Sequence, residues 1–166
     1  MRQRLAVGNW KMHGSLPENQ VLLEAVAAGA NGLRRAGCAI CIPFPYLAQA
    51  QSVLSGSQVM WGAQNVSQHP RGAFTGEVSA AMVREFGCRY VIVGHSERRQ
   101  MFGEDDRTVA AKAKAVLAAG MAPIVCVGET LAERESGVTE AVIGRQMRVV
   151  ADELGVTPTC GVRIKL

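Results

Sequence analysis

The segment covering residues 91–99 carries a histidine at the end of an apolar run, placed where it could take part in proton chemistry. It reads Val-Ile-Val-Gly-His-Ser-Glu-Arg-Arg, so one glycine separates the run from His95. If the chain is helical from Ser96 onward, His95 lies at a helix N-terminus, where the helix dipole disfavours a protonated ring. A neutral imidazole there could donate a hydrogen bond to a carbonyl oxygen and stabilise an enediolate as it forms. The alternative is a histidine that only caps the helix or packs.

A second polar group follows the first apolar run of the chain, in the segment Gly-Asn-Trp-Lys-Met at residues 8–12. Lys11 supplies a compact positive charge that suits a phosphate or a developing oxyanion, and Asn9 supplies an amide. A lysine in a loop is usually solvated surface. Glu97 favours a position for Lys11 inside the mouth of a site, because a lysine held there needs a carboxylate partner and Glu97 is placed to provide one. These residue types predict a site for a small phosphorylated carbonyl compound.

Short apolar runs alternate with helical patterns along the chain and must position these groups. The expected strands cover residues 5–9, 38–42, 59–63, 90–93 and 122–127. The expected helices cover residues 18–36, 46–54, 78–86, 106–119 and 139–154. The strands are apolar throughout, which is typical of a parallel sheet covered by helices.

Five βα units in a row form either an open doubly wound sheet or a barrel. Polar residues gather just after the strand ends, and in both architectures that edge binds ligands. No G-x-G-x-x-G segment follows the first strand, and the sequence has no Walker A motif, which argues against a nucleotide site.

The composition of the 166 residues is that of one ordinary globular domain. The net charge is +4, but the basic residues form no stripe with interleaved aromatics, so no nucleic-acid partner is expected. No signal peptide and no membrane span is recognisable, which predicts a soluble, cytoplasmic protein without membrane contact.

Cysteines are five in number, and Cys38 and Cys41 have the C-x-x-C spacing of redox and zinc sites. They lie in an apolar run that reads as a strand, where residues three apart point to opposite faces. We therefore expect small core residues in a reducing compartment, with no disulfide and no metal site.

Four segments in order resemble triosephosphate isomerase: residues 9–12, 72–77 (Gly-Ala-Phe-Thr-Gly-Glu), 91–99 and 127–135 (Val-Gly-Glu-Thr-Leu-Ala-Glu-Arg-Glu). The resemblance extends over about residues 5 to 155. It implies a (βα)₈-barrel enzyme of glycolysis and gluconeogenesis that interconverts dihydroxyacetone phosphate and D-glyceraldehyde 3-phosphate through an enediolate. It also implies that the enzyme uses no cofactor and no metal and is usually a homodimer.

Carried over by position, the resemblance gives roles to the polar residues described above. Asn9 and Lys11 bind the substrate, and Lys11 also stabilises the charge of the transition state. The resemblance implies that His95 is the electrophile and acts as a neutral imidazole. Glu97 pairs with Lys11, and Ser96 helps to set the turn.

Two further residues take their expected roles from the same resemblance. Thr75 lies on the long loop after the third strand, which in this family inserts into the partner subunit beside its asparagine and lysine. Cys126 lies near the end of the fifth strand, behind the site, where we expect it to pack.

The chain departs from the family pattern after residue 155. A full barrel of this type has eight βα units and roughly 250 residues. We expect an incomplete barrel of about five units over residues 1–155, followed by an unaligned tail over residues 156–166. Residues 162–164 could form a sixth, edge-like strand. A shifted reading frame or a deletion would each account for such a tail.

The family's general base is a glutamate after strand six, whereas the last acidic residue here is Glu153. Glu97 is expected to be committed to Lys11, and Glu129 to order the loop after the fifth strand. The base and the phosphate cradle are thus missing, and we expect the chain alone to be inactive or nearly so. The alternatives are a non-catalytic fragment that docks on a full-length subunit, or a different phosphosugar enzyme on the same scaffold.

Overall fold

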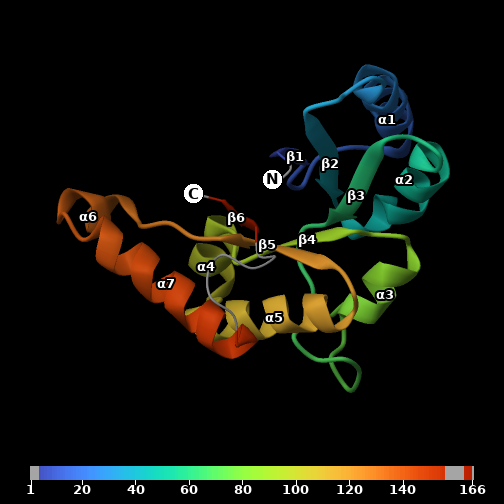
Figure 1. Ribbon diagram of the computed structural model, residues 1–166. Coiled ribbons are helices and arrows are strands. Elements are labelled where there is room, and N and C mark those ends of the chain that lie inside the picture. The colour runs from blue at the N-terminus through green and yellow to red at the C-terminus, as the bar shows by residue number, and fades with distance from the viewer. Residues whose placement is uncertain (1–3, 156–162, 166) are drawn as a thin grey trace.

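The computed structural model describes residues 4–155 and 163–165, and side chains are described for residues 4–155. It contains a parallel sheet whose strand order follows the chain (Figure 1). The strands are β1 (Arg4–Asn9), β2 (Ala36–Ile42), β3 (Val59–Ala63), β4 (Tyr90–Val93), β5 (Ala122–Cys126) and β6 (Arg163–Lys165). The helices are α1 (Leu16–Ala30), α2 (Leu47–Leu54), α3 (Ala80–Glu85), α4 (Ser96–Phe102), α5 (Asp106–Ala118), α6 (Leu131–Glu135) and α7 (Thr139–Leu154), with a 3₁₀ turn at Phe44–Tyr46.

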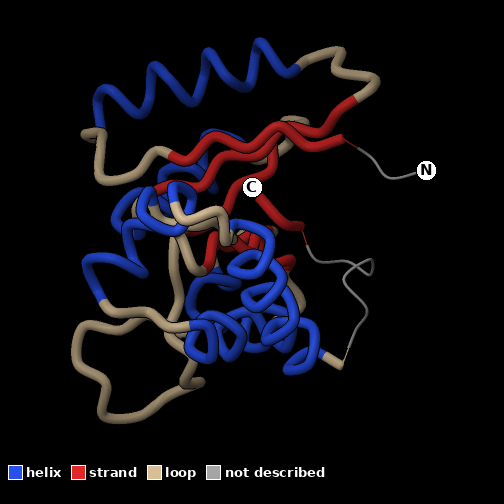
Figure 2. Tube along the Cα trace, turned by 90° about the vertical axis from the view of Figure 1, so that its left-hand side faces the viewer, coloured by secondary structure: helices blue, strands red, loops and turns tan. Residues whose placement is uncertain are grey.

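The sheet is an incomplete barrel rather than a doubly wound sheet. Each strand pairs in parallel with the next strand along the chain, so the strand order does not reverse at any point of the described sheet. The strands curl and the helices lie on the outside of the curl (Figure 2). This confirms the predicted fold class.

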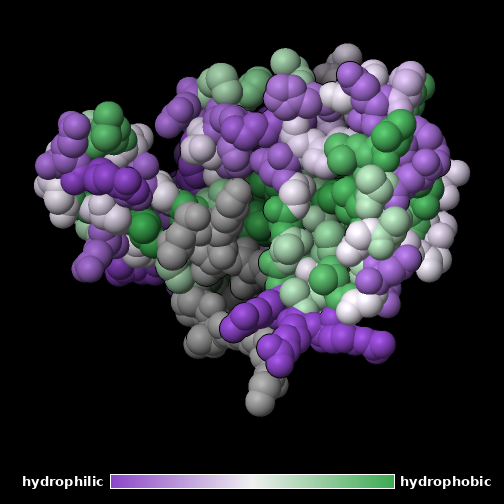
Figure 3. Space-filling model, turned by 90° about the horizontal axis from the view of Figure 1, so that it is seen from above, coloured by the Kyte–Doolittle hydropathy of each residue, from purple (hydrophilic) through white to green (hydrophobic). Residues whose placement is uncertain are grey.

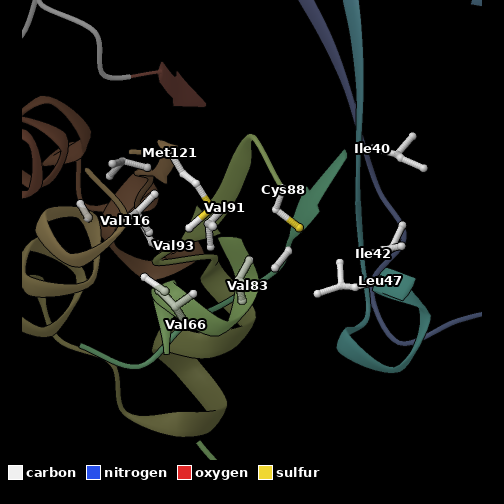
Figure 4. Close-up of a cluster of buried hydrophobic side chains, with 14 of the residues drawn as sticks. Ile40, Ile42, Leu47, Val66, Val83, Cys88, Val91, Val93, Val116 and Met121 are labelled. Carbon is white, nitrogen blue, oxygen red and sulfur yellow. The ribbon is translucent and has the colours of Figure 1, made fainter. Parts of the chain in front are cut away.

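Both faces of the central strands are buried. Successive side chains of a strand point to opposite faces, so each strand contributes to two separate clusters. Val91 and Val93 of β4 pack between the sheet and the helices, together with Val83, Val116 and Met121 (Figure 4). A second cluster lies on the concave face and consists of Ala39, Cys41, Tyr90, Ile92, Ile124 and Cys126. The continuously apolar strand sequences reflect this two-sided burial.

The first helix is shorter than predicted. It ends at Ala30 rather than at residue 36, because Asn31 is extended and Gly32 takes a left-handed φ of 89°. Glycine reaches that conformation without steric cost, so the chain turns there and β2 begins at Ala36, before the predicted residue 38. The Asn31-Gly32 pair is a local turn signal that the prediction overlooked.

Helix α6 was not predicted, although its sequence carries a start signal. Thr130 accepts a hydrogen bond from the Glu133 backbone, and the Glu133 carboxylate accepts one from the Thr130 N–H. This capping box stabilises a helix of a single turn and a half, which is too short to show a periodic apolar pattern.

Cysteine placement agrees with the prediction from the strand spacing. Cys41 is in the concave cluster, whereas Cys38 packs against the cluster on the helix side, and both are free thiols. Burial raises the pKa of Cys41 and of Cys88 to about 12, so both thiols stay protonated. Cys160 lies outside the described residues.

The tail contributes one short strand among the residues that the structure describes. β6 pairs in parallel with β5, with Ile124 opposite Arg163. This confirms the expected sixth strand for residues 163 and 164, whereas residue 162 lies outside the described part. No helix in the described ranges is both long and apolar enough to cross a membrane.

Candidate active site

A cavity of about 670 Å³ opens at the carboxyl ends of the strands. Its polar lining comes from the end of β1, from the segments that follow β1, β3 and β4, and from the first turn of α4, namely Asn9, Lys11, His13, Gln64, Asn65, His95, Glu97 and Arg98. Its apolar lining includes Met12, Phe44, Ile92, Met101 and Phe102. Parallel strands bring their carboxyl ends to one edge, so residues far apart in the sequence meet here.

Lys11 is held in an uncommon backbone conformation. Its φ is 53°, a left-handed value that costs a non-glycine residue roughly 1–2 kcal/mol. The Lys11 N–H donates to Asn9 Oδ1 over 3.0 Å, and the Trp10 N–H donates to the Cys41 carbonyl oxygen over 3.0 Å. These two hydrogen bonds anchor the strained turn to the end of the sheet.

The lysine side chain meets the start of α4. Lys11 Nζ lies 2.6 Å from Glu97 Oε1, although the two residues are 86 positions apart in the sequence. The ammonium group that donates to Glu97 holds the pKa of this carboxyl below its ordinary value. Glu97 is therefore ionised at neutral pH and is engaged as the partner of Lys11.

The chain is helical from Ser96 onward, so His95 is the N-cap residue of α4 and lies at the N-terminus of that helix. Its Nδ1 lies 3.3 Å from both the Glu97 backbone nitrogen and Glu97 Oε2. The Glu97 backbone N–H can only donate, so it needs a lone pair on Nδ1 as its acceptor. A hydrogen bond from Nδ1 to the Glu97 carboxylate would instead require a proton on Nδ1. That arrangement would leave the backbone N–H without an acceptor on the ring. We assign the ring proton to Nε2, which makes Nε2–H a donor in a neutral ring.

A buried ionic cluster supports α4 from behind the cavity. Glu104 Oε1 accepts hydrogen bonds from Arg98 Nε and Lys112 Nζ, each over 2.5 Å. Lys112 also donates to Asn65 Oδ1 over 2.8 Å. The side chains of Glu104 and Lys112 are only 5% and 7% exposed. Sequence analysis missed this cluster, although a lysine on the buried face of α5 was its visible signal.

A second ionic group fixes the turn before His95. Arg99 donates to the Gly94 carbonyl oxygen over 2.9 Å and to Asp106 Oδ1 over 2.6 Å. Arg145 of α7 donates to the other oxygen of Asp106 over 3.0 Å. The glycine that precedes the histidine is thus tied to α4, α5 and α7.

Three other predicted residues do not line the cavity. Ser96 is the exposed first residue of α4. Thr75 is exposed on the loop covering residues 64–79, which projects beyond α3 in Figures 1 and 2. Cys126 is buried in the concave cluster, where it packs, and its carbonyl oxygen accepts a hydrogen bond from Arg99.

Glu129 follows β5 and has local partners of its own. Backbone hydrogen bonding, followed by the hydrogen bond from Arg134 Nε at 2.7 Å, lowers the pKa of Glu129. Gln146 of α7 binds the neighbouring Gly128 at both its N–H and its carbonyl oxygen. Glu129 is therefore an ionised residue that orders the loop. Within residues 4–155, no group of three or more His, Cys, Asp or Glu side chains is arranged to hold a metal ion.

Comparisons with known proteins agree with this arrangement. A model of the triosephosphate isomerase family matches residues 4–162. Triosephosphate isomerase from Cupriavidus necator is 65% identical over 156 residues, which are 94% of this chain and 62% of that protein. The enzyme from Thiobacillus denitrificans is 60% identical with the same coverage.

A solved structure extends the similarity to three dimensions. The crystal structure of triosephosphate isomerase from Bartonella henselae superposes with a TM-score of 0.89 at 36% sequence identity. The superposition covers 98% of this chain and 67% of that chain. The chain thus spans about 62% of the length of the curated relatives that it matches.

Proposed function

Because the chain belongs to the triosephosphate isomerase family, we propose that its cavity binds a three-carbon sugar phosphate and polarises the substrate carbonyl for enediolate formation. The observation that carries this proposal is the convergence of Lys11, Glu97 and His95 on one cavity. The reaction would be the interconversion of dihydroxyacetone phosphate and D-glyceraldehyde 3-phosphate.

Each group has a role that follows from its surroundings. The Nε2–H of a neutral His95 donates to the carbonyl oxygen, where negative charge develops as the enediolate forms. Lys11 contributes a fixed positive charge for the phosphorylated anion, and Asn9 holds the turn on which Lys11 lies. Glu97 keeps the ammonium group of Lys11 in place, and the same contact pairs its own carboxylate.

Proton abstraction needs a carboxylate base, and both Glu97 and Glu129, the two candidates considered from the sequence, are already paired. Glu97 binds Lys11, and Glu129 binds Arg134. Removal of a general base typically lowers a rate by about 10²–10⁴-fold. We therefore propose that the 166-residue polypeptide by itself binds the substrate but turns it over slowly or not at all.

A coupled isomerase assay on the purified polypeptide tests this proposal, together with substrate binding followed by NMR of the His95 ring. We expect dihydroxyacetone phosphate to shift the His95 resonances, with turnover at least about 10²-fold below that of the Cupriavidus necator relative. Lys11→Met should abolish the shift, whereas Lys114→Met, on a distant exposed pair, should leave it intact. Turnover as fast as that of the relative, if the His95→Gln substitution in this chain abolishes it, would overturn the proposed inactivity. Absence of binding would overturn the assigned site.

We also propose that the loop covering residues 64–79 docks on a second subunit of the family, as in a homodimer. In support, the loop is exposed around Thr75, and Phe74 stacks on His69 with ring centroids 4.1 Å apart, which presents a preformed apolar tip. Co-elution with a full-length relative would be lost in Phe74→Asp. No co-elution of the unmodified chain would contradict this proposal. As a glycolytic protein the chain would act in the cytoplasm, which cell fractionation tests.

A further inference from the structure

Five exposed arginines gather at the amino-terminal ends of the strands, on the edge of the sheet opposite the cavity. They are Arg4 at the start of β1, Arg34 and Arg35 just before β2, Arg84 in the last turn of α3, and Arg89 just before β4. Figure 3 shows strongly hydrophilic side chains that project together from the lower edge of that view, which is the end where the strands begin. These five arginines are called the basic rim below. They come from separate segments, so their clustering is not visible along the sequence.

The arginines of the basic rim have no carboxylate partner. Within residues 4–155, none of their side chains forms an ion pair or a hydrogen bond. In contrast, four arginines toward the carboxyl edge each bind a carboxylate, namely Arg98, Arg99, Arg134 and Arg145. The arginines toward the cavity are thus neutralised internally, whereas those of the rim are available to an external anion.

The positive charge of the rim is not balanced by neighbouring residues of the chain. Glu85 is the single acidic residue among Arg4 and the segments that lead into β2, β3 and β4, which are residues 31–35, 55–58 and 84–89. The whole sequence holds 18 basic and 14 acidic residues, so 13 of each remain when the five arginines and Glu85 are set aside. The formal net charge of +4 therefore equals the excess on the rim, and a local excess of one sign attracts ligands of the other sign.

The rim is longer than a single phosphate ion. Arg4 lies beside Arg35, because Arg4 pairs with Ala36 across β1 and β2. Arg89 is fixed at the other end of the rim, since its N–H donates to the Trp61 carbonyl oxygen over 2.8 Å. Neighbouring strands are about 4.8 Å apart, so the three steps from β1 to β4 cover about 14 Å along the sheet. A single phosphate can contact one end of this row, whereas a linear chain of phosphate groups can contact both.

We propose that the basic rim binds a linear polyphosphate chain, which extends from Arg4 and Arg35 to Arg89. The planar guanidinium group of arginine suits this ligand, because its N–H donors match two phosphate oxygens at once. A nucleic-acid strand fits less well, since its bases need a succession of aromatic rings and Phe86 is the one aromatic residue in these segments. The proposal goes beyond the proposed function and does not depend on the roles of Lys11 and His95 at the opposite edge.

The probe is an end-labelled linear polyphosphate long enough to span the rim, and fluorescence anisotropy measures its binding to the 166-residue chain. We expect the affinity to fall roughly 100-fold between about 50 and 200 mM salt, because each phosphate that is neutralised releases counterions. Inorganic phosphate at the same total phosphate concentration should compete poorly, because it reaches one end of the rim only. The double variant Arg34→Gln with Arg35→Gln should lower the affinity at least about tenfold at low salt.

The matched control is the double variant Arg107→Gln with Arg148→Gln, which removes the same charge from exposed arginines on α5 and α7. It should bind the probe like the unmodified chain. Equal losses in the two double variants would overturn the proposal, because net charge rather than the rim would then hold the probe. Full competition by inorganic phosphate would overturn it as well, and so would tighter binding of a single-stranded RNA of equal charge.

Two further measurements separate this proposal from the proposed function. His95→Gln should bind polyphosphate normally. The variant of Arg34 and Arg35 should still show the shift of the His95 resonances with dihydroxyacetone phosphate. Loss of polyphosphate binding in His95→Gln would place the polyphosphate in the cavity instead of on the rim.

Discussion

Lys11 Nζ and Glu97 Oε1 lie 2.6 Å apart, and this contact joins the strained turn after β1 to the first turn of α4. The same glutamate donates its backbone N–H to His95 Nδ1. One residue therefore sets both the position of the cationic group and the tautomer of the histidine. Our first two predictions test these two functions of Glu97.

The pairing of Glu97 with Lys11 predicts a pH-dependent contribution to stability. The pKa of Glu97 is lowered in the folded chain from its ordinary value of 4.5, so the stabilisation is present above that value and is lost as the pH falls through the folded pKa. Urea midpoints measured from pH 7 down to pH 3 should therefore fall more steeply for the unmodified chain than for Glu97→Gln. Parallel curves for the two proteins would show that the pair contributes nothing.

The hydrogen bond to Nδ1 predicts the Nε2–H tautomer of His95. Nitrogen-15 NMR at neutral pH should show a protonated Nε2 and an unprotonated Nδ1 on this ring. The exposed His13 ring is an internal control, because the structure fixes no tautomer for it by a backbone donor. A protonated Nδ1 on His95 would show that Glu97 Oε2 rather than the backbone N–H is its partner.

The buried pair of Glu104 and Lys112 should be costly to break from one side. Lys112→Met leaves the Glu104 carboxylate with one cation fewer in a dry environment, and we expect a loss of about 3–5 kcal/mol in the free energy of unfolding. Urea unfolding measures this loss. The control is Lys114→Met, because its pair with Glu153 is largely exposed and should be worth less than about 1 kcal/mol. Equal effects of the two substitutions would contradict the assigned burial.

Gly94, which precedes His95, should tolerate no side chain. Its φ is 69°, and a Cβ atom would lie 2.6 Å from Val109 Cγ1. Gly94→Ala therefore adds a clash to backbone strain, whereas Gly103→Ala, at a φ of 65° with open space around it, adds strain alone. We expect Gly103→Ala to cost about 1–2 kcal/mol and Gly94→Ala clearly more, measured by chemical unfolding. Equal losses would remove the argument for close packing at this turn.

The strands were the most predictable elements of the fold. The structure has β3 and β4 at the predicted residues 59–63 and 90–93, because a short apolar run between turn residues is a local signal. The end of α1 was mispredicted, although Asn31 and Gly32, which follow the last helical residue, are a local turn signal. For the candidate site, Asn9, Lys11, His95 and Glu97 were all selected from their types and positions, and the structure places all four on one cavity.

The sequence by itself determined the alternation of buried strands and helices and the four segments that resemble triosephosphate isomerase, because both are encoded in residues close together along the chain. Only the tertiary structure decided that Lys112 shares Glu104 with Arg98 and that Arg145 binds the same aspartate as Arg99. The contact of Lys11 with Glu97 across 86 positions was expected from the family resemblance, and the structure supplies its geometry. These relationships depend on how the sheet curls and on which loops meet at its carboxyl edge. An ion pair between distant residues has no local signature, since its energy arises only when folding brings the two charges out of water together.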